Sequence, residues 1–400
     1  DGAINFSKIR GFISREDHEK YCQKYRPAMG DVFLVKSGAT TGKLAIVTVS
    51  SEFSIWSPLA AIRSENEKAI PRFIYHSMSS REFQTSIELN WSYGTQQNIG
   101  MGVIERLPVP LPPLPEQQAI ADYLDTETQR IDTLIAELRE MIRLLKEKRQ
   151  ALISHCVTKG LDPTVPMKDS GVEWLGEVPE GWEVVRISLV ATLESGHTPS
   201  RNRPEYWENC TIPWFSLADV WQLRNGTEKY VSATNELVSE LGLAHSSARL
   251  LPAGTVMLSR TASVGFPAIM AIDMATTQDF ANWVCGKRLF NEFLYYCFIA
   301  MKDEFRRLTM GSTHQTIYMP DINAMRIGVP PYECQLRIAA HLDRETAKID
   351  RLIAETEDTI TLMQERRSAL ISSVVTGKLQ VPGIAEPSGS TLNSRPESLK

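Results

Sequence analysis

The chain has 400 residues, and its 43 Lys and Arg against 48 Asp and Glu give a formal net charge of -5. This balance excludes a polycation that coats nucleic acid through charge alone, but it leaves room for DNA binding through local basic patches. The 42% hydrophobic and 23% charged residues are typical of a globular protein with two or three domains. No run of roughly 18 apolar residues occurs, so we expect no membrane span and a cytoplasmic location.

Residues 1–115 are expected to form a first globular domain with a mixed sheet and short helices. An apolar strand after Gly30 runs into a small, hydroxyl-rich turn, and the proline-rich segment Leu107–Pro115 closes the domain. Proline blocks a helix upstream and favours an extended connector. The chain starts at Asp1 without a starting Met, and the comparison with the second half predicts that about 58 residues are missing from the first domain.

Two long helices are predicted, over 116–160 and 333–379. Residues 120–161 and 338–379 are identical at 23 of 42 positions, which makes them an internal repeat offset by 218 residues. Apolar residues recur every 3.5 positions on average, the pattern of a coiled-coil seam. The predicted seam comprises Ile131, Leu138, Leu145, Leu152, Ile349, Ile353, Ile360, Met363 and Leu370, with Leu134, Ile135, Met141, Ile142 and Leu352 at further seam positions. We expect the helices to pair antiparallel with each other; two core helices in separate domains are the alternative.

A second globular domain is predicted over 167–331, and it repeats the first more weakly. Its turn Arg260–Ser263 resembles Lys36–Lys43, and Gly311–Gln315 resembles Gly94–Asn98. Both domains also share a Phe-x-Tyr segment at the start of a short helix, at Phe73 and at Phe293. The predicted fold class is therefore α+β, with a pseudo-twofold internal repeat. Residues 381–400 are rich in Ser, Pro and Gly, which predicts a disordered tail.

Motifs that resemble catalytic sites do not satisfy the chemistry they would need. Gly38–Lys43 is one residue short of a phosphate-binding loop, and Leu44 replaces the hydroxyl that would hold magnesium. Val329–Tyr332 resembles the tetrapeptide of amino-methyltransferases, but a valine cannot hydrogen-bond an exocyclic amine. The six cysteines show no CxxC spacing, and the seven histidines lie apart. We therefore predict no catalytic residue, no metal site and no cofactor in this chain.

The polar turns of both domains have the chemistry of a DNA reader. Gln and Asn can pair bidentately with adenine, Arg and Lys can pair with guanine, and hydroxyl groups can hold phosphate. Each of these residues could equally be part of a solvated turn. The candidate DNA-binding residues are Lys36, Ser37, Thr40, Thr41, Lys43, Gln96, Gln97, Asn98, Arg260, Thr261, Ser263, Thr313, His314 and Gln315.

The whole set of features resembles the specificity (S) subunit of type I restriction–modification systems. The resemblance is carried by the helix repeats, by the Pro-Pro-Leu-Pro-Glu-Gln approach at 112–117, and by the segments Trp174–Val184 and Ser195–Trp207. The chain departs from the family pattern in two ways. Its first domain lacks the Trp-Glu and Gly-Thr-Pro segments, and its second helix starts with Glu333-Cys334-Gln335 where the first starts with Glu116-Gln117-Gln118.

The resemblance implies a non-catalytic subunit with two target-recognition domains, each reading one half of a split, asymmetric site in double-stranded DNA. The paired helices would set the spacing and dock two modification (methyltransferase) subunits. S-adenosylmethionine, ATP and Mg would belong to those subunits and to added restriction/translocase subunits. Thr198, Ser200, Arg201 and Asn202 match the family's Gly-Thr-Pro loop and become further DNA-binding candidates, whereas Tyr206, Trp207, Trp214 and Trp221 are expected in the core.

Two alternatives to this interpretation remain. The first is a stand-alone DNA adenine methyltransferase or nuclease. The second is a coiled-coil scaffold that does not bind DNA.

Overall fold

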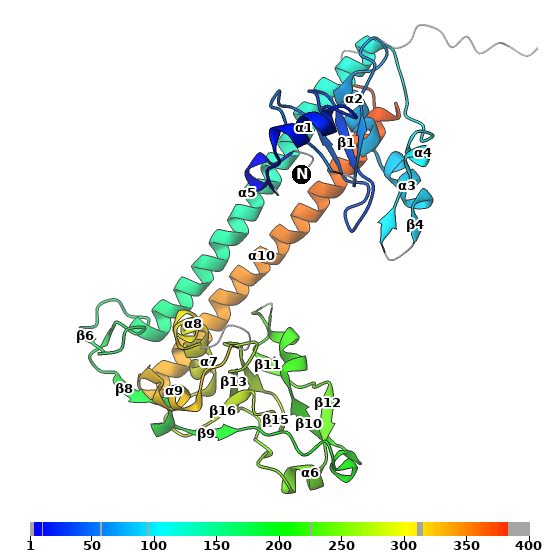
Figure 1. Ribbon diagram of the computed structural model, residues 1–400. Coiled ribbons are helices and arrows are strands. Elements are labelled where there is room, and N and C mark those ends of the chain that lie inside the picture. Colours follow the sequence, from blue (N-terminus) through cyan, green and yellow to red (C-terminus); the bar gives the residue numbers. More distant parts are fainter. Residues whose placement is uncertain are drawn as a thin grey trace, which may run out of the picture. The chain divides into compact units, whose positions relative to one another are not determined.

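The computed structural model describes residues 4–9, 11–56, 58–93, 96–224, 226–309 and 315–382, and it divides into two compact units. Unit 1 comprises Asp1–Arg139 and Glu357–Lys400, and unit 2 comprises Glu140–Thr356. The division passes through both long helices, α5 (Leu114–Lys159) and α10 (Tyr332–Val375). Each unit therefore contains one globular domain, the start of one long helix and the end of the other (Figure 1).

The globular part of unit 1 is built around a small antiparallel sheet with the strand order β2–β1–β3. Its strands are β1 (Val32–Val35), β2 (Leu44–Ile46) and β3 (Leu59–Ile62), and a hairpin is formed by β4 (Ser92–Tyr93) and β5 (Gln97–Asn98). The helices are η1 (Phe6–Lys8), α1 (Arg15–Cys22), α2 (Pro71–Ser79), α3 (Arg81–Asn90) and α4 (Met101–Ile104). The core joins Leu34 of β1 and Phe73 of α2 to Leu124 of α5 and Val374 of α10, so the long helices are part of this domain's core.

Unit 2 contains a larger sheet with the order β11–β14–β13–β16–β9 and a second sheet with the order β12–β10–β15. The large sheet comprises β9 (Ala191–Ser195), β11 (Tyr230–Val231), β13 (Val256–Ser259), β14 (Pro267–Met270) and β16 (Phe280–Cys285), and the small one β10 (Ile212–Phe215), β12 (Glu236–Val238) and β15 (Ala275–Thr276). Two further strand pairs are β6 (Met167–Asp169) with β7 (Glu177–Pro179), and β8 (Glu183–Arg186) with β17 (Arg326–Val329).

Short helices pack around both sheets of unit 2. They are η2 (Ile187–Leu189), η3 (Pro204–Trp207), η4 (Leu217–Leu223), α6 (Glu240–Ala244), α7 (Asn291–Ala300), α8 (Lys302–Leu308) and α9 (Met319–Ala324). Figure 1 shows α7 beside β13 and β16, and Phe293 and Phe298 of α7 share a buried cluster with Trp283 of β16. Ile153 of α5 and Leu342 of α10 belong to the same cluster, as their counterparts do in unit 1.

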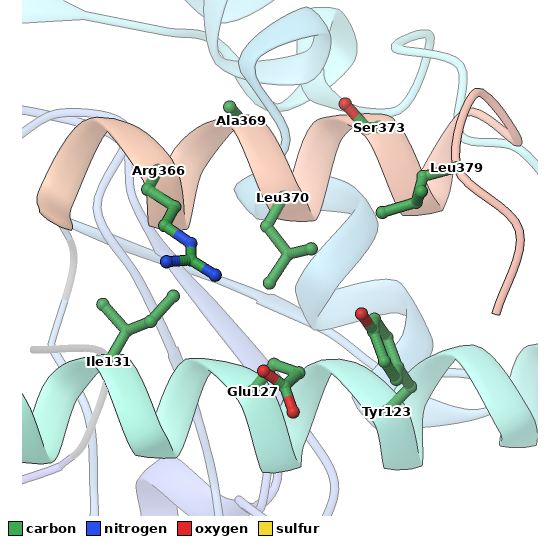
Figure 2. A pocket seen from close by; sticks show the side chains of 8 residues that line it. All are labelled: Tyr123, Glu127, Ile131, Arg366, Ala369, Leu370, Ser373 and Leu379. Atoms are coloured by element: carbon green, nitrogen blue, oxygen red, sulfur yellow. The ribbon is translucent and has the colours of Figure 1, made fainter. Parts of the chain in front are cut away.

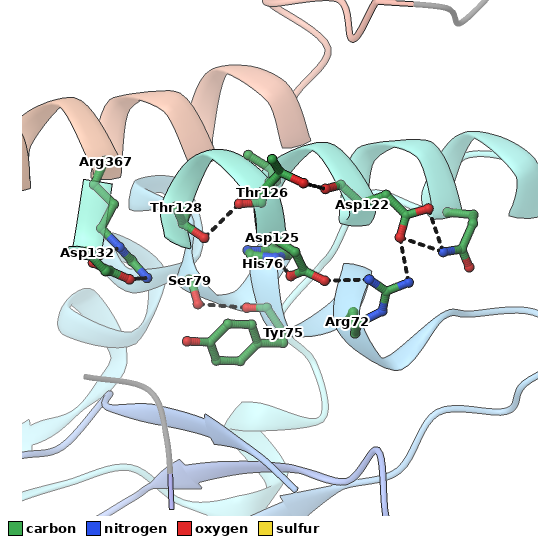
Figure 3. Close-up of polar contacts among 12 residues, drawn as sticks. Arg72, Tyr75, His76, Ser79, Asp122, Asp125, Thr126, Thr128, Asp132 and Arg367 are labelled. Atoms are coloured by element: carbon green, nitrogen blue, oxygen red, sulfur yellow. Dashed lines mark hydrogen bonds and ion pairs between the residues drawn. The ribbon is translucent and has the colours of Figure 1, made fainter. Parts of the chain in front are cut away.

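The two long helices run antiparallel within each unit, as predicted. In unit 1, Nε of Arg367 on α10 lies 2.9 Å from Oδ1 of Asp132 on α5 (Figure 3). In unit 2, Nε of Arg149 on α5 lies 2.8 Å from Oδ1 of Asp350 on α10. The repeat offset of 218 residues relates Asp132 to Asp350 and Arg149 to Arg367, so the same ion pair occurs twice with the helices exchanged.

The residues of the predicted seam are all buried or half-buried, but the apolar stripe is narrower than expected. Ile131, Ile349 and Ile353 are buried, and Leu138, Leu145, Leu152, Ile360, Met363 and Leu370 are half-buried. The further seam positions are wrong for Leu134, Met141 and Leu352, whose exposed fractions are 40%, 38% and 37%. A pair of helices covers only a stripe of a and d positions, and these three residues lie beside it.

Glycine terminates both long helices. Gly160 and Gly377 have φ values of 76° and 73°, the left-handed conformation that commonly follows the last turn of a helix. The expected end of the second helix at 379 is therefore wrong, because α10 ends at Val375. The tail predicted for 381–400 lies outside the described residues from 383 onwards. The predicted domain limits at 115, 167 and 331 stay predictions.

Candidate nucleic-acid interface

In unit 1, the turn after β1 and the hairpin strand β5 lie together, which brings most candidate residues of this domain to one place. The N–H of Lys36 donates to Pro58 O at 2.7 Å, and its carbonyl accepts from the Ile99 N–H at 2.8 Å. Ser37 forms a bridge with Asn98. Thr40, Lys43, Gln96 and Asn98 are exposed, and Lys36, Ser37, Thr41 and Gln97 are half-buried.

The same arrangement recurs in unit 2 with different side chains. The N–H of Arg260 donates to Asp279 O at 2.8 Å, and its carbonyl accepts from the Ile317 N–H at 2.9 Å. Thr261 forms a bridge with Thr316. Lys36 and Arg260 therefore occupy equivalent backbone positions, each at the end of the central strand of its sheet. The weak sequence repeat between the two turns corresponds to a repeat in three dimensions.

The cations of these turns have hydrogen-bonding capacity to spare. Nη1 of Arg260 donates to Ile317 O at 3.3 Å, while its buried Nε finds no acceptor among the described residues. A guanidinium carries five N–H donors, so most of them stay available. Of the remaining candidates, Ser263 is half-buried, Gln315 is exposed, and Thr313 and His314 lie outside the described residues.

The loop Thr198–Asn202 joins this edge of unit 2, because the carboxyl ends of β9, β10, β13 and β15 meet there. The N–H of His197 donates to Thr276 O at 3.0 Å, and the Thr198 hydroxyl donates to Oε1 of Gln278 at 2.8 Å. Gln278 is exposed and was not among the candidates. It lies in no repeated motif, so no sequence signal pointed to it.

Arg201 is already engaged inside its own domain. Its Nη2 lies 2.5 Å from Oε2 of Glu236, and its guanidinium carbon lies 3.8 Å from the Trp207 ring centre. The carbonyl of Ser200 accepts from the Trp207 indole N–H at 3.2 Å. Through these contacts Arg201 and Ser200 stabilise the loop against the rest of the domain. DNA binding by Arg201, Ser200 and the exposed Asn202 stays a prediction.

The aromatic residues near this loop differ in burial. Trp214 is buried, as expected for a core residue, and Tyr206 and Trp207 are half-buried. Trp221 on η4 is 63% exposed, so its assignment to the core is wrong. It follows a capping box of Ser216 and Asp219, and the short helix that results turns the indole outwards.

A repeated carboxylate ties each globular domain to a long helix. In unit 1, Asp125 of α5 accepts from Nη1 of Arg72 at 2.5 Å and lies 2.7 Å from Nε2 of His76 (Figure 3). Burial alone would raise the pKa of Asp125, but the hydrogen bonds from His76 and Arg72 outweigh it and hold the pKa below its usual value. In unit 2, the equivalent Asp343 accepts from Tyr296 and from Nζ of Lys229, the latter at 2.6 Å.

A fully buried glutamine fixes the start of each long helix. Oε1 of Gln117 accepts from the Ile70 N–H at 2.9 Å, and its Nε2 donates to Lys68 O and Pro112 O at 3.0 and 2.7 Å. Gln335 repeats these bonds with the Phe290 N–H and the carbonyls of Arg288 and Pro330. The two helix starts still differ, because the repeat offset aligns Cys334 with Glu116. The same offset aligns Gln335 with Gln117, so the buried amide is retained in both copies.

A groove of about 250 Å³ lies between the two helices of unit 1. Figure 2 shows Tyr123, Glu127 and Ile131 of α5 facing Arg366 and Leu370 of α10 across it. Ala369, Ser373 and Leu379 complete the lining. The repeat offset places Glu345, Ile349, Lys148, Ala151, Leu152 and Leu161 at the corresponding positions of unit 2, so most of the lining chemistry occurs twice.

The described residues contain neither a metal cluster nor a membrane helix. Among them, no three His, Cys, Asp or Glu side chains gather as a metal site would require. Within the same ranges, no helix combines the length and apolarity needed to cross a bilayer.

Comparison with known proteins agrees with this geometry. The chain resembles the type I restriction enzyme MjaIX specificity subunit of Methanocaldococcus jannaschii, with 30% identity over 170 residues, 42% of this chain and 38% of that protein. The MjaVIII specificity subunit of the same organism is 22% identical over 366 residues, 88% of this chain and 80% of its own. The match to the first relative thus spans well under half of its length.

A solved structure supports the fold. A chain from a study of complex assembly and conformational transition in the type I R-M system superposes with a TM-score of 0.71 at 18% identity, covering 88% of this chain and 83% of that one. The family model for the type I restriction modification DNA specificity domain matches residues 2–143 and 179–362, which together cover most of the chain and both of its units. The chain therefore belongs to the type I restriction modification DNA specificity family.

Proposed function

We propose that this chain is the non-catalytic specificity subunit of a type I restriction–modification complex and that it reads a two-part, asymmetric site in double-stranded DNA. The observation that carries the proposal is the pair of equivalent turns. Lys36 and Arg260 occupy the same hydrogen-bonded position at the end of a central strand, but they differ in side chain and in the loops around them. Two similar frames with different polar surfaces suit the recognition of two different half-sites.

The long helices are proposed to dock two copies of a modification subunit. The groove in unit 1 and the matching residues in unit 2 support two copies, because a repeated surface suits a repeated partner. In both units the positions hold Glu, Ile, Ala and two Leu residues, with Arg366 in one and Lys148 in the other. Leu379 and Leu161 are both exposed at these positions, so each unit offers apolar area beside charge.

Catalysis is assigned to the partners. S-adenosylmethionine would bind to the modification subunits, and ATP and Mg would bind to restriction/translocase subunits. Family membership does not support the alternatives of a stand-alone methyltransferase or nuclease, or of a scaffold that does not bind DNA.

The proposal is tested by reconstitution with the cognate modification subunits. We expect the purified chain alone to transfer no methyl group, and the assembled complex to methylate a bipartite motif that sequencing of methylated bases identifies. Methylation by the chain alone, or a complex without a bipartite preference, would contradict the proposal.

The docking surface is tested separately at the exposed Ala369. Ala369→Arg should fill the groove of unit 1 and leave one modification subunit on each complex, measured by native mass spectrometry. The equivalent substitution Ala151→Arg should remove the other copy, and the double variant should remove both. An exposed alanine outside these helices, Ala253→Arg, is the matched control. Full occupancy in the double variant would refute docking at this groove.

A further inference from the structure

The loop after β9 is fixed on the loop after β15 by a close backbone approach. A Cβ atom at Gly196 would lie 2.2 Å from the carbonyl oxygens of Thr276 and Thr277, so only glycine fits there. The His197 N–H donates to Thr276 O at 3.0 Å, and the Thr277 N–H donates to Phe215 O at 3.0 Å. These contacts join the two sheets of unit 2 and give both loops one defined position.

Gln278 lies in the loop after β15, and its side-chain amide is exposed. Its neighbours Thr276 and Thr277 are buried, whereas Gln278 itself is exposed. The Thr198 hydroxyl donates to its Oε1 at 2.8 Å, which orients the amide. This bond uses one of the two lone pairs of Oε1, so one lone pair and both donors of Nε2 stay available. Nε2 has no acceptor among the described residues.

The surroundings of Gln278 match those of a base reader. The next residue, Asp279, accepts the backbone N–H of Arg260 through its carbonyl at 2.8 Å, so the amide lies beside the turn that carries the cation. A preorganised side chain loses little conformational entropy on binding. An amide that offers one donor and one acceptor complements N7 and the N6 amino group of adenine, whereas guanine offers two acceptors there.

From this geometry we infer that Gln278 reads an adenine in the half-site of unit 2, and that Thr198 is a positioning residue which orients its amide. The inference rests on the proposed DNA-reading function and assigns its specificity to a named side chain. It also gives Thr198 a role without a DNA contact. In unit 2, Arg260 would then contact a neighbouring guanine or phosphate with its free donors.

The test uses the chain assembled with its modification subunits, and sequencing of methylated DNA gives the motif. Gln278→Ala should reduce the preference for adenine at one position of one half-site from about ten- to hundredfold to nearly none. The other half-site should stay unchanged. Gln278→Glu keeps the shape but removes the donors, so it should lose the same preference.

Variants of Thr198 test its positioning role, and a variant of the distant Asn323 is the control. Thr198→Val should weaken the preference at that same position, and Thr198→Ser, which keeps the hydroxyl, should restore it. Asn323→Ala removes an exposed amide of α9 that bonds only to Met319 O, and it should leave the motif intact. An unchanged motif in both Gln278 variants, or a relaxed position without an A·T pair, would overturn the inference. A wild-type complex without any bipartite motif would instead refute the proposed function itself.

Discussion

Replacing Gln117 by methionine should destabilise unit 1 without changing the volume of its core. Methionine has nearly the length of glutamine but neither its donor nor its acceptor. The substitution removes three hydrogen bonds, to the N–H of Ile70 and to the carbonyls of Lys68 and Pro112. Ile70 is the N-cap residue of α2, and its N–H has no other acceptor among the described residues, so it would lose its hydrogen bond.

The cost follows from the burial of the amide. Gln117 is fully buried, so water cannot replace the lost bonds. Each hydrogen bond contributes about 0.5–1.5 kcal/mol, and an unpaired buried group costs about 1–3 kcal/mol. We therefore expect a loss of about 3 kcal/mol, which for a unit of this size lowers Tm by about 6–12 °C. Gln335→Met should cost a similar amount in unit 2, because its three bonds are the same.

Calorimetry of the full chain measures both effects, and the neighbouring Gln118 is the control. Gln118 is exposed and bonds only to the exposed Asp122, so Gln118→Met should change the free energy of unfolding by less than about 0.5 kcal/mol. If Gln117→Met shifts Tm no further than Gln118→Met does, Gln117 does not fix the start of α5.

Three further outcomes are expected. Gly196→Ala should destabilise unit 2 by more than about 3 kcal/mol in denaturant unfolding. Gly181→Ala is the control and should be nearly neutral, because an added Cβ there meets nothing within 4 Å. Equal effects of the two substitutions would contradict the close backbone approach at Gly196. Arg149→Asp and Asp350→Arg should each destabilise the chain, and the double exchange should recover about 1 kcal/mol as a coupling energy; additive losses would show that the ion pair contributes nothing. His76 and Arg72 lower the pKa of Asp125 in the folded chain. The stability that this carboxylate contributes is therefore complete above about pH 4 and is lost as the pH falls through the lower folded pKa. The difference in unfolding free energy between wild type and Asp125→Asn should accordingly disappear in acid, and a difference independent of pH would refute this.

The helical part of the fold could be predicted because its signal is local and repeated. The 3.5-residue apolar spacing and the match between the two copies predicted both helices and their antiparallel pairing. The buried glutamines could not be predicted in the same way. A glutamine in the first turn of a helix usually faces water. Two of the three backbone groups that bind Gln117 lie 47 and 49 residues earlier in the chain.

The candidate interface was predicted in part. Lys36 and Arg260 were found because their turns repeat in the sequence, and the structure places them equivalently. Gln278 was missed because its orientation depends on Thr198, which is 80 residues away. Trp221 was assigned to the core by residue type, whereas its capped short helix exposes it. Contacts between distant segments determine which polar side chains are held outwards, and residue type alone does not report such contacts.

The contacts of the long helices repeat in both units, whereas the polar turns differ between them. Both copies share the buried glutamine at the helix start, the ion pair between the helices and most of the groove lining. The turn cations differ, being Lys36 in unit 1 and Arg260 in unit 2, and the oriented pair of Thr198 and Gln278 lies in unit 2. A partner that binds the helices would therefore meet the same chemistry twice, while DNA would meet two different surfaces. Substitutions in the turns should then change the base sequence that is read without weakening the assembly with the modification subunits. The buried glutamines and the ion pairs between the helices use no side chain of the turns.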